Sequence, residues 1–210
     1  MPGPLAQHPP TTHLLYLHGF RSSPQSMKAR KVVARVRERH PGVTWWCPQL
    51  PASPAEAMAL LQQGMAGWPR DSSAVIGSSL GGFYARWLAL HTGIRSVLLN
   101  PAVFPARDLA RHIGELTAWH DPQETIHFQP AYVDALRTME SDIRRLAANH
   151  PATPESQFAI VARGDEVLDW QEMLAFCAGG AVRLLPASDH AVSDFDEHID
   201  AVFGFLQLLT

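Results

Sequence analysis

Residues 74–82 read A-V-I-G-S-S-L-G-G and contain the pattern G-x-S-x-G, formed by Gly77, Ser79 and Gly81. This pattern is typical of a sharp turn from a strand into a helix that exposes a nucleophilic serine. Glycine on either side of the serine leaves the backbone room to close such a strained turn. The apolar residues before the turn predict a buried strand, and residues 83–90 repeat apolar side chains at helical spacing. The stretch therefore predicts a strand–serine–helix unit of an α/β fold.

The rest of the chain alternates strand-like and helix-like segments, which is the pattern of a parallel sheet covered on both faces. Besides residues 74–78, the predicted strands are residues 13–17, 43–47, 96–100, 158–162 and 182–185. The other predicted helices cover about residues 22–39, 54–68 and 194–208. We therefore expect a six-stranded, mostly parallel sheet with helices on both faces.

Residues 101–154 interrupt this alternation. They contain two segments of helical character, residues 107–119 and 130–148, and no convincing strand. Because ligands of open α/β sheets bind beyond the carboxyl ends of the strands, an insertion after such an end is placed to act as a small helical cap. Phe128 and Tyr132 are then candidates to line an acyl pocket. An ordinary crossover with two helices is the alternative.

Length and composition restrict the class of protein. The 210 residues fit one domain spanning residues 1–210, with a Pro-rich, disordered leader over residues 1–12. The net charge of -3 gives no electrostatic footprint for nucleic acid, and no apolar run approaches the ~20 residues of a membrane span. The cysteines and histidines form no disulfide framework or metal-binding motif. We expect a cytoplasmic protein that uses no metal ion or cofactor.

A nucleophilic serine needs a base, and the base needs a carboxylate that orients it. In the expected fold the chain order is serine, acid, histidine. Asp165 directly follows the predicted strand 158–162 and is our choice for the acid. Glu166 is expected to point into solvent. Asp169 competes for the role, although its position also suits the N-cap of the following helix.

His190 is the predicted base, because it lies on the loop between the last predicted strand and the last predicted helix. His198 is its rival. That residue falls within the closing helix, on a face shared with Asp194, and we interpret this face as solvated.

A tetrahedral oxyanion needs two N–H donors. We assign these to the backbone amides of Leu80, directly after the serine, and Phe20, on the loop after the first strand. Gly19 tolerates the backbone angles that such a loop requires. The neighbouring His18 is expected to orient the loop by hydrogen bonding.

Besides G-S-S-L-G-G-F-Y at residues 77–84, the chain contains L-H-G-F at 17–20, S-S-P at 22–24, L-N-P-A at 99–102, G-D-E-V-L-D at 164–169 and S-D-H at 188–190. Together these segments resemble the small bacterial YqiA/YcfP-type esterases of the α/β-hydrolase superfamily. The likeness extends over about residues 13–207. It implies an α/β-hydrolase-like three-layer sandwich without the first antiparallel strands, with Ser79, Asp165 and His190 as a catalytic triad. It also implies cleavage of a small-molecule carboxylic ester or thioester.

Two alternatives stay open. The first is a thioester hydrolase that releases an acyl chain from a carrier such as coenzyme A. A basic patch near the pocket mouth would favour it, and Arg21, Lys28, Arg30 and Lys31 are the candidates. The second is a hydrolase-like fold that binds a ligand without turnover, since one fold hosts many functions. The complete set of triad residues in the expected order favours an active serine esterase.

Overall fold

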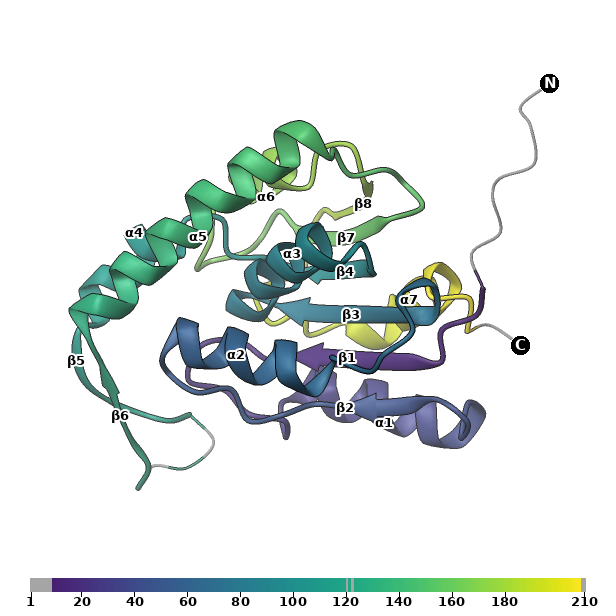
Figure 1. The fold of residues 1–210 in the computed structure, drawn as a ribbon, viewed down its shortest axis with the longest axis horizontal. Helices are drawn as coiled ribbons and strands as arrows, with labels where there is room; N and C mark the ends of the chain where they lie inside the picture. The colour runs from purple at the N-terminus through teal and green to yellow at the C-terminus, as the bar shows by residue number, and fades with distance from the viewer. Residues whose placement is uncertain (1–8, 120, 122, 209–210) are drawn as a thin grey trace.

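A computed structural model of the chain describes residues 9–119, 121 and 123–208. Six strands form one sheet in the order β2-β1-β3-β4-β7-β8, and every neighbouring pair is parallel (Figure 1). The strands are β1 (His13–Leu17), β2 (Thr44–Trp46), β3 (Ser73–Ser78), β4 (Arg95–Leu99), β7 (Gln157–Ala162) and β8 (Ala181–Leu185). The six-stranded sheet predicted from the sequence is confirmed, with strand ends that differ by at most one residue.

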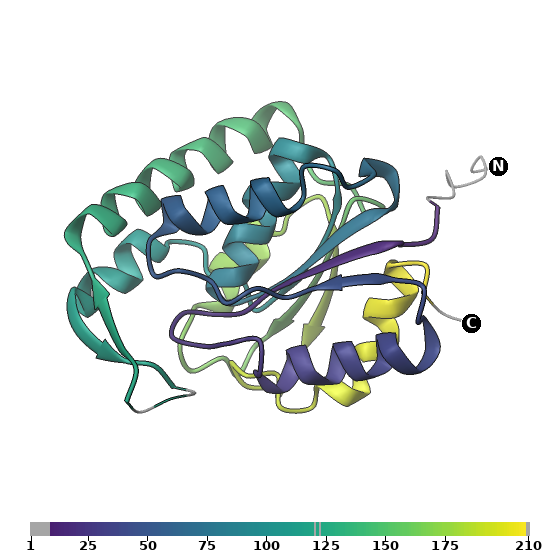
Figure 2. The same ribbon diagram turned by 60° about the horizontal axis from the view of Figure 1, so that its bottom comes forward.

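Helices cover both faces of the sheet (Figure 2). Their bounds are α1 (Met27–Arg39), α2 (Pro54–Gly64), α3 (Leu80–Thr92), α4 (Pro105–Leu109), α5 (Pro130–Asn149), α6 (Trp170–Phe176) and α7 (Ile199–Phe205), with short 3-10 turns at η1 (Arg70–Ser72), η2 (Ala110–His112) and η3 (Phe195–Glu197). Helices α1 and α7 pack on one face, and α2, α3, α5 and α6 pack on the other. The result is a three-layer α/β sandwich. None of the described helices combines the length and the hydropathy that a membrane crossing requires.

The central strands are buried on both faces, because each face is covered by helices. Successive side chains of β1 alternate between the two core clusters: Leu15 and Leu17 face α2 and α3, whereas Leu14 and Tyr16 face α1 and α7. This is the two-residue period of a strand. It explains why these strands read in the sequence as continuous apolar runs rather than as alternating ones.

The insertion after β4 differs from the predicted pair of helices. The helix expected over residues 107–119 is wrong beyond η2, because the chain there forms strand β5 (Gly114–Thr117), which pairs antiparallel with β6 (Thr125–Phe128). Gly114, with φ +124, starts the hairpin in a backbone conformation that a helix cannot use. The hairpin and the long helix α5 project together at the left of Figure 1. The insertion is thus a mixed helix–hairpin–helix segment.

The N-terminal segment is ordered closer to the start than expected. The predicted disordered leader covers residues 1–12, of which residues 1–8 lie outside the described residues. For residues 9–12 the prediction is wrong: Thr11 is buried and its hydroxyl donates to Leu206 O at 2.7 Å. Arg95 also donates to Pro9 O at 3.0 Å. These bonds attach the segment to the end of α7 and to the start of β4 before β1 begins.

Candidate functional site

Ser79 lies on the sharp turn between β3 and α3. Its backbone has φ 56 and ψ -121, a conformation that is costly for a residue with a side chain. The turn closes only because its neighbours lack side chains: a Cβ on Gly77 would lie 2.1 Å from Gly81 O, and one on Gly81 would lie 2.1 Å from Leu17 O. The Ser79 amide also donates to Leu99 O at 3.0 Å. The predicted turn is therefore present and tied to the neighbouring strand β4.

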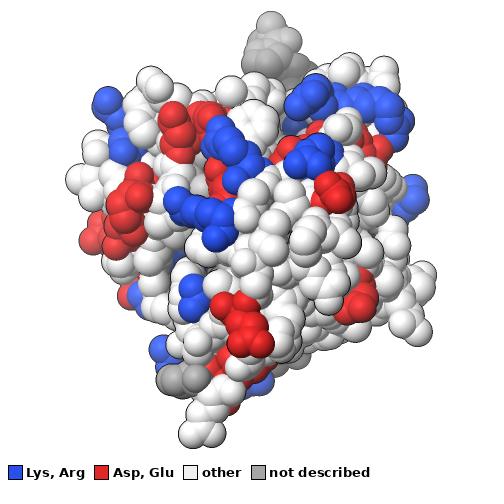
Figure 3. All heavy atoms as spheres, turned by 90° about the vertical axis from the view of Figure 1, so that its left-hand side faces the viewer, with Lys and Arg blue, Asp and Glu red and all other residues white. Residues whose placement is uncertain are grey.

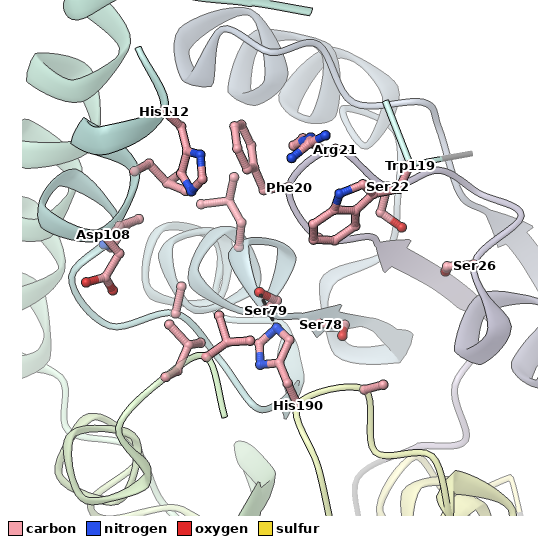
Figure 4. Close-up of a pocket in the computed structure, with 18 of the residues that line it drawn as sticks. Phe20, Arg21, Ser22, Ser26, Ser78, Ser79, Asp108, His112, Trp119 and His190 are labelled. Atoms are coloured by element: carbon pink, nitrogen blue, oxygen red, sulfur yellow. Dashed lines mark hydrogen bonds between the residues drawn. The ribbon is translucent and has the colours of Figure 1, made fainter. Parts of the chain in front are cut away.

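The structure brings the three predicted side chains together in one hydrogen-bonded chain. His190 Nε2 lies 3.1 Å from Ser79 Oγ (Figure 4). On the other side of the ring, His190 Nδ1 lies 2.7 Å from Asp165 Oδ2. The Asp165 side chain is fully buried, and its Oδ1 accepts the amides of Val167 and Leu168, each at 2.8 Å. A carboxylate in this position accepts from Nδ1, which leaves Nε2 as the acceptor for the serine hydroxyl.

Asn100, directly after β4, joins the loops that carry Asp165 and His190. Its side-chain oxygen accepts the Ala162 amide at 2.8 Å, and its Nδ2 donates to the carbonyls of Asp189 and His190 at 2.9 and 3.1 Å. The residue is fully buried, with φ 42, a conformation that asparagine tolerates better than most residues. Sequence reasoning missed this role. The available signal was a polar residue directly after the buried apolar strand 95–99.

The competing acids occupy other positions. Asp169 caps α6, where its side chain accepts the Gln171 amide at 2.7 Å. The expectation that Glu166 points away into solvent is wrong in part: the residue is exposed, yet its carboxylate accepts the His190 amide at 3.0 Å. Glu166 thereby holds the backbone of the loop that carries His190. The rival base His198 hydrogen-bonds Asp194 through Nε2 at 3.2 Å.

The loop after β1 lies against the serine. A Cβ on Gly19 would approach Ser79 Cβ to 3.3 Å, so the backbone of this loop is close to Ser79. The buried His18 ring accepts the Leu50 amide at Nε2, at 3.1 Å, which makes Nδ1 the donor to Gly19 O at 2.9 Å. His18 orients the loop as expected. Within the described residues, the amide of Phe20, which lies in no helix or strand, donates to no backbone carbonyl. The amide of Leu80 donates to no backbone carbonyl outside α3.

A cavity of about 580 Å³ opens above Ser79. Its apolar lining includes Phe20, Met27, Leu80, Leu109, Trp119 and Leu168. The expectation that Phe128 and Tyr132 line this cavity is wrong. The Phe128 side chain is buried behind Phe20, with 5.2 Å between the ring centroids, and Tyr132 packs against Phe128 in turn. The hairpin brings Trp119 to the cavity instead.

Charged groups also reach the cavity. Of the four basic candidates, Arg21 and Lys28 line it, whereas Arg30 and Lys31 do not. Lys31 pairs with Asp196 at 2.7 Å on the outside of α1. Arg21 donates to Thr117 O at 2.6 Å and stacks over the Trp119 ring at 5.2 Å, which fixes the hairpin to the loop after β1.

Comparisons with known proteins agree with this architecture. Est1E from Butyrivibrio proteoclasticus superposes with a TM-score of 0.70 at 17% identity, covering 94% of this chain and 88% of that chain. The esterase domain of a Rhodothermus marinus protein gives 0.64 at 14% identity, covering 97% and 87%. The esterase Pf2001 of Pyrococcus furiosus gives 0.60 at 17% identity, covering 95% and 82%. These likenesses show the α/β-hydrolase fold. The family described as "Uncharacterised protein family (UPF0227)" matches over residues 13–207, so the chain belongs to that family.

Proposed function

We propose that this protein is a serine hydrolase that cleaves carboxylic esters by acyl transfer. The observation that carries the proposal is the hydrogen-bonded chain from Ser79 through His190 to Asp165, at the base of a largely apolar cavity. The strained backbone of Ser79 supports it as well, because strain of this kind persists where it serves a site.

The geometry fits a two-step reaction. His190 Nε2 takes the proton of Ser79 as the hydroxyl attacks the acyl carbonyl, and the buried Asp165 stabilises the imidazolium that forms. The amides of Phe20 and Leu80 bind the developing oxyanion. His190 then protonates the departing alcohol and activates a water molecule, which releases the acid from Ser79.

A fluorophosphonate label followed by peptide mapping tests the nucleophile, and a series of 4-nitrophenyl esters tests turnover. We expect the label on Ser79 and a loss of roughly 10³ to 10⁶ in kcat on Ser79→Ala. A label on another residue would falsify the assignment. Absence of both labelling and turnover in the folded protein would favour the ligand-binding module without catalysis.

A thioester hydrolase is the second candidate, because Arg21 and Lys28 line the cavity and could meet the phosphates of an acyl carrier. The two candidates differ in the leaving group alone. Comparing kcat/KM for an acyl-coenzyme A with that for the 4-nitrophenyl ester of the same acid separates them. A much higher value for the ester supports our proposal.

A further inference from the structure

Lys28, in the first turn of α1, places a cation in the wall of the cavity. The residue is 8% exposed, and its ammonium group donates to the carbonyl of Ala191, next to His190. No carboxylate in the part of the chain that the structure describes forms an ion pair with it. Burial lowers the pKa of Lys28 to about 8, and the more distant Asp189 and Asp165 act in the opposite direction. The group therefore stays mostly protonated at pH 7 without a charged partner.

Two serines, Ser26 and Ser78, line the same cavity as Lys28. The buried hydroxyls of Ser26 and Tyr16 make no hydrogen bond of normal geometry to any described group, although the Tyr16 hydroxyl lies near Ser26 and Ser78. Figure 4 shows Ser26 and Ser78 on one side of Ser79, opposite Asp108. Because Ser26 has no well-formed bond to lose, rotation about its Cα–Cβ bond can turn its hydroxyl toward a bound ligand.

Most of the other charged residues of the cavity have the same sign as Lys28. Four of its lining residues are cationic and one is anionic: Arg21, Lys28, Arg107 and Arg111 against Asp108. Within the described chain, Arg107 alone of these cations is ion-paired with carboxylates. On the outer face that carries the hairpin, basic and acidic side chains are interspersed (Figure 3). The cavity lining therefore carries an excess of positive charge.

A purely structural role does not account for this arrangement. Burying an ammonium group is unfavourable unless it is paired and fully hydrogen-bonded, and one neutral carbonyl supplies one of the three acceptors it needs. The buried Ser26 hydroxyl, in the same cavity lining, also lacks a well-formed partner. An anion bound in the cavity would supply a partner for both Lys28 and Ser26.

We propose that Lys28, with Ser26 and Ser78, binds an anionic group of the substrate, a carboxylate or a phosphate. The proposal rests on the serine hydrolase function and names the class of substrate. Ser78 is the residue before the nucleophile, so the anionic group would lie on the α1 side of the reacting carbonyl. The remaining, apolar part of the cavity would hold the uncharged part of the ester.

The test compares two esters of equal chain length, the mono-4-nitrophenyl ester of adipic acid and 4-nitrophenyl hexanoate, after subtraction of spontaneous hydrolysis. We expect the ratio of their kcat/KM values to favour the anionic ester in the parent. Lys28→Met and Ser26→Ala should each lower that ratio, by about 10-fold or more for Lys28→Met, because a hydrogen bond to a charged group is lost. The matched control is Lys31→Met, on the outside of the same helix, which should leave the ratio unchanged.

Loss of the bond to Ala191 O can slow both esters in Lys28→Met, but a merely structural role would leave the ratio unaltered. Adipate and inorganic phosphate, added as inhibitors of hexanoate hydrolysis, distinguish a carboxylate from a phosphate: the better-matched anion inhibits the parent more strongly and loses this advantage in Lys28→Met. A parent that cleaves hexanoate without preferring the anionic ester, or a preference that both variants retain, overturns the inference alone. A parent that cleaves neither ester overturns the proposed function.

Discussion

At the scale of single residues, the acid of the proposed triad can be tested by comparing two neighbouring aspartates. Asp165 holds the His190 ring, whereas Asp169 caps a helix. Asp165→Asn would present an amide to Nδ1 and favour the wrong tautomer, and the analogous change in a serine protease lowers kcat by about 10⁴. We expect a loss of that order, with the fold intact by circular dichroism.

Asp169→Asn is the matched control, because asparagine caps a helix as well as aspartate does. It should keep kcat within about twofold and change the free energy of unfolding by about 0.5 kcal/mol or less. The reverse pattern in kcat would move the acid of the triad to Asp169.

A second prediction at this scale concerns Asn100, which acts through the loops it connects. Asn100→Asp replaces two N–H donors by a carboxylate oxygen that faces the carbonyls of Asp189 and His190. We expect kcat to fall by about 10- to 100-fold and labelling of Ser79 by fluorophosphonate to slow in parallel, since an unsatisfied buried polar contact costs about 1–3 kcal/mol. Asn149→Asp, an exposed change on α5, is the control. Labelling at the parental rate would show that Asn100 does not position the base.

At the scale of elements, the hairpin β5–β6 decides the shape of the cavity. It places Trp119, 67% exposed, in the cavity lining and is held by the contact with Arg21. Each methylene of an acyl chain buried against this wall should contribute up to ~0.8 kcal/mol, so kcat/KM should rise with chain length until the cavity is full.

Trp119→Ala should flatten that rise for long acyl chains and leave cleavage of an acetyl ester intact, because it removes the wall and none of the reacting groups. Phe128→Ala, in the layer behind Phe20, is the comparison. It should mainly lower stability, by about 3–5 kcal/mol as for other buried aromatic truncations. Profiles of the same steepness in the parent and in Trp119→Ala would show that the hairpin does not select the acyl chain.

At the scale of the whole molecule, the sequence predicted what depends on local pattern. The alternation of buried strands and helices, and the glycines around Ser79, follow from short segments whose physical requirements are strict. Asp165 and His190 could be found because each follows a strand end. The hairpin could not, because its strands are only four residues long and mostly exposed, and although β6 (T-I-H-F) alternates, its partner β5 (G-E-L-T) contains a single apolar side chain. The contacts of Asn100 and Glu166 join segments distant in the chain, and such contacts leave no periodic signal.

The buried cation at the site should lower the stability of the whole domain. The pKa of Lys28 is about 8 in the folded state against an ordinary value of 10.5, so between these pH values the unfolded chain binds more protons. As pH rises through this window, Lys28 loses its buried charge in the folded state and the free energy of unfolding increases. Below pH 8 the charge lowers the free energy of unfolding by its full amount, about 3 kcal/mol.

Lys28→Met removes this penalty and also a hydrogen bond of about 1 kcal/mol to Ala191 O. Urea unfolding at pH 7 should show the variant more stable by about 2 kcal/mol, and at pH 10.5 slightly less stable than the parent. Equal differences at both pH values would mean that folding does not lower the pKa of Lys28, so that its charge is not desolvated in the folded protein, and an anion site built on a buried cation would then lose its physical basis.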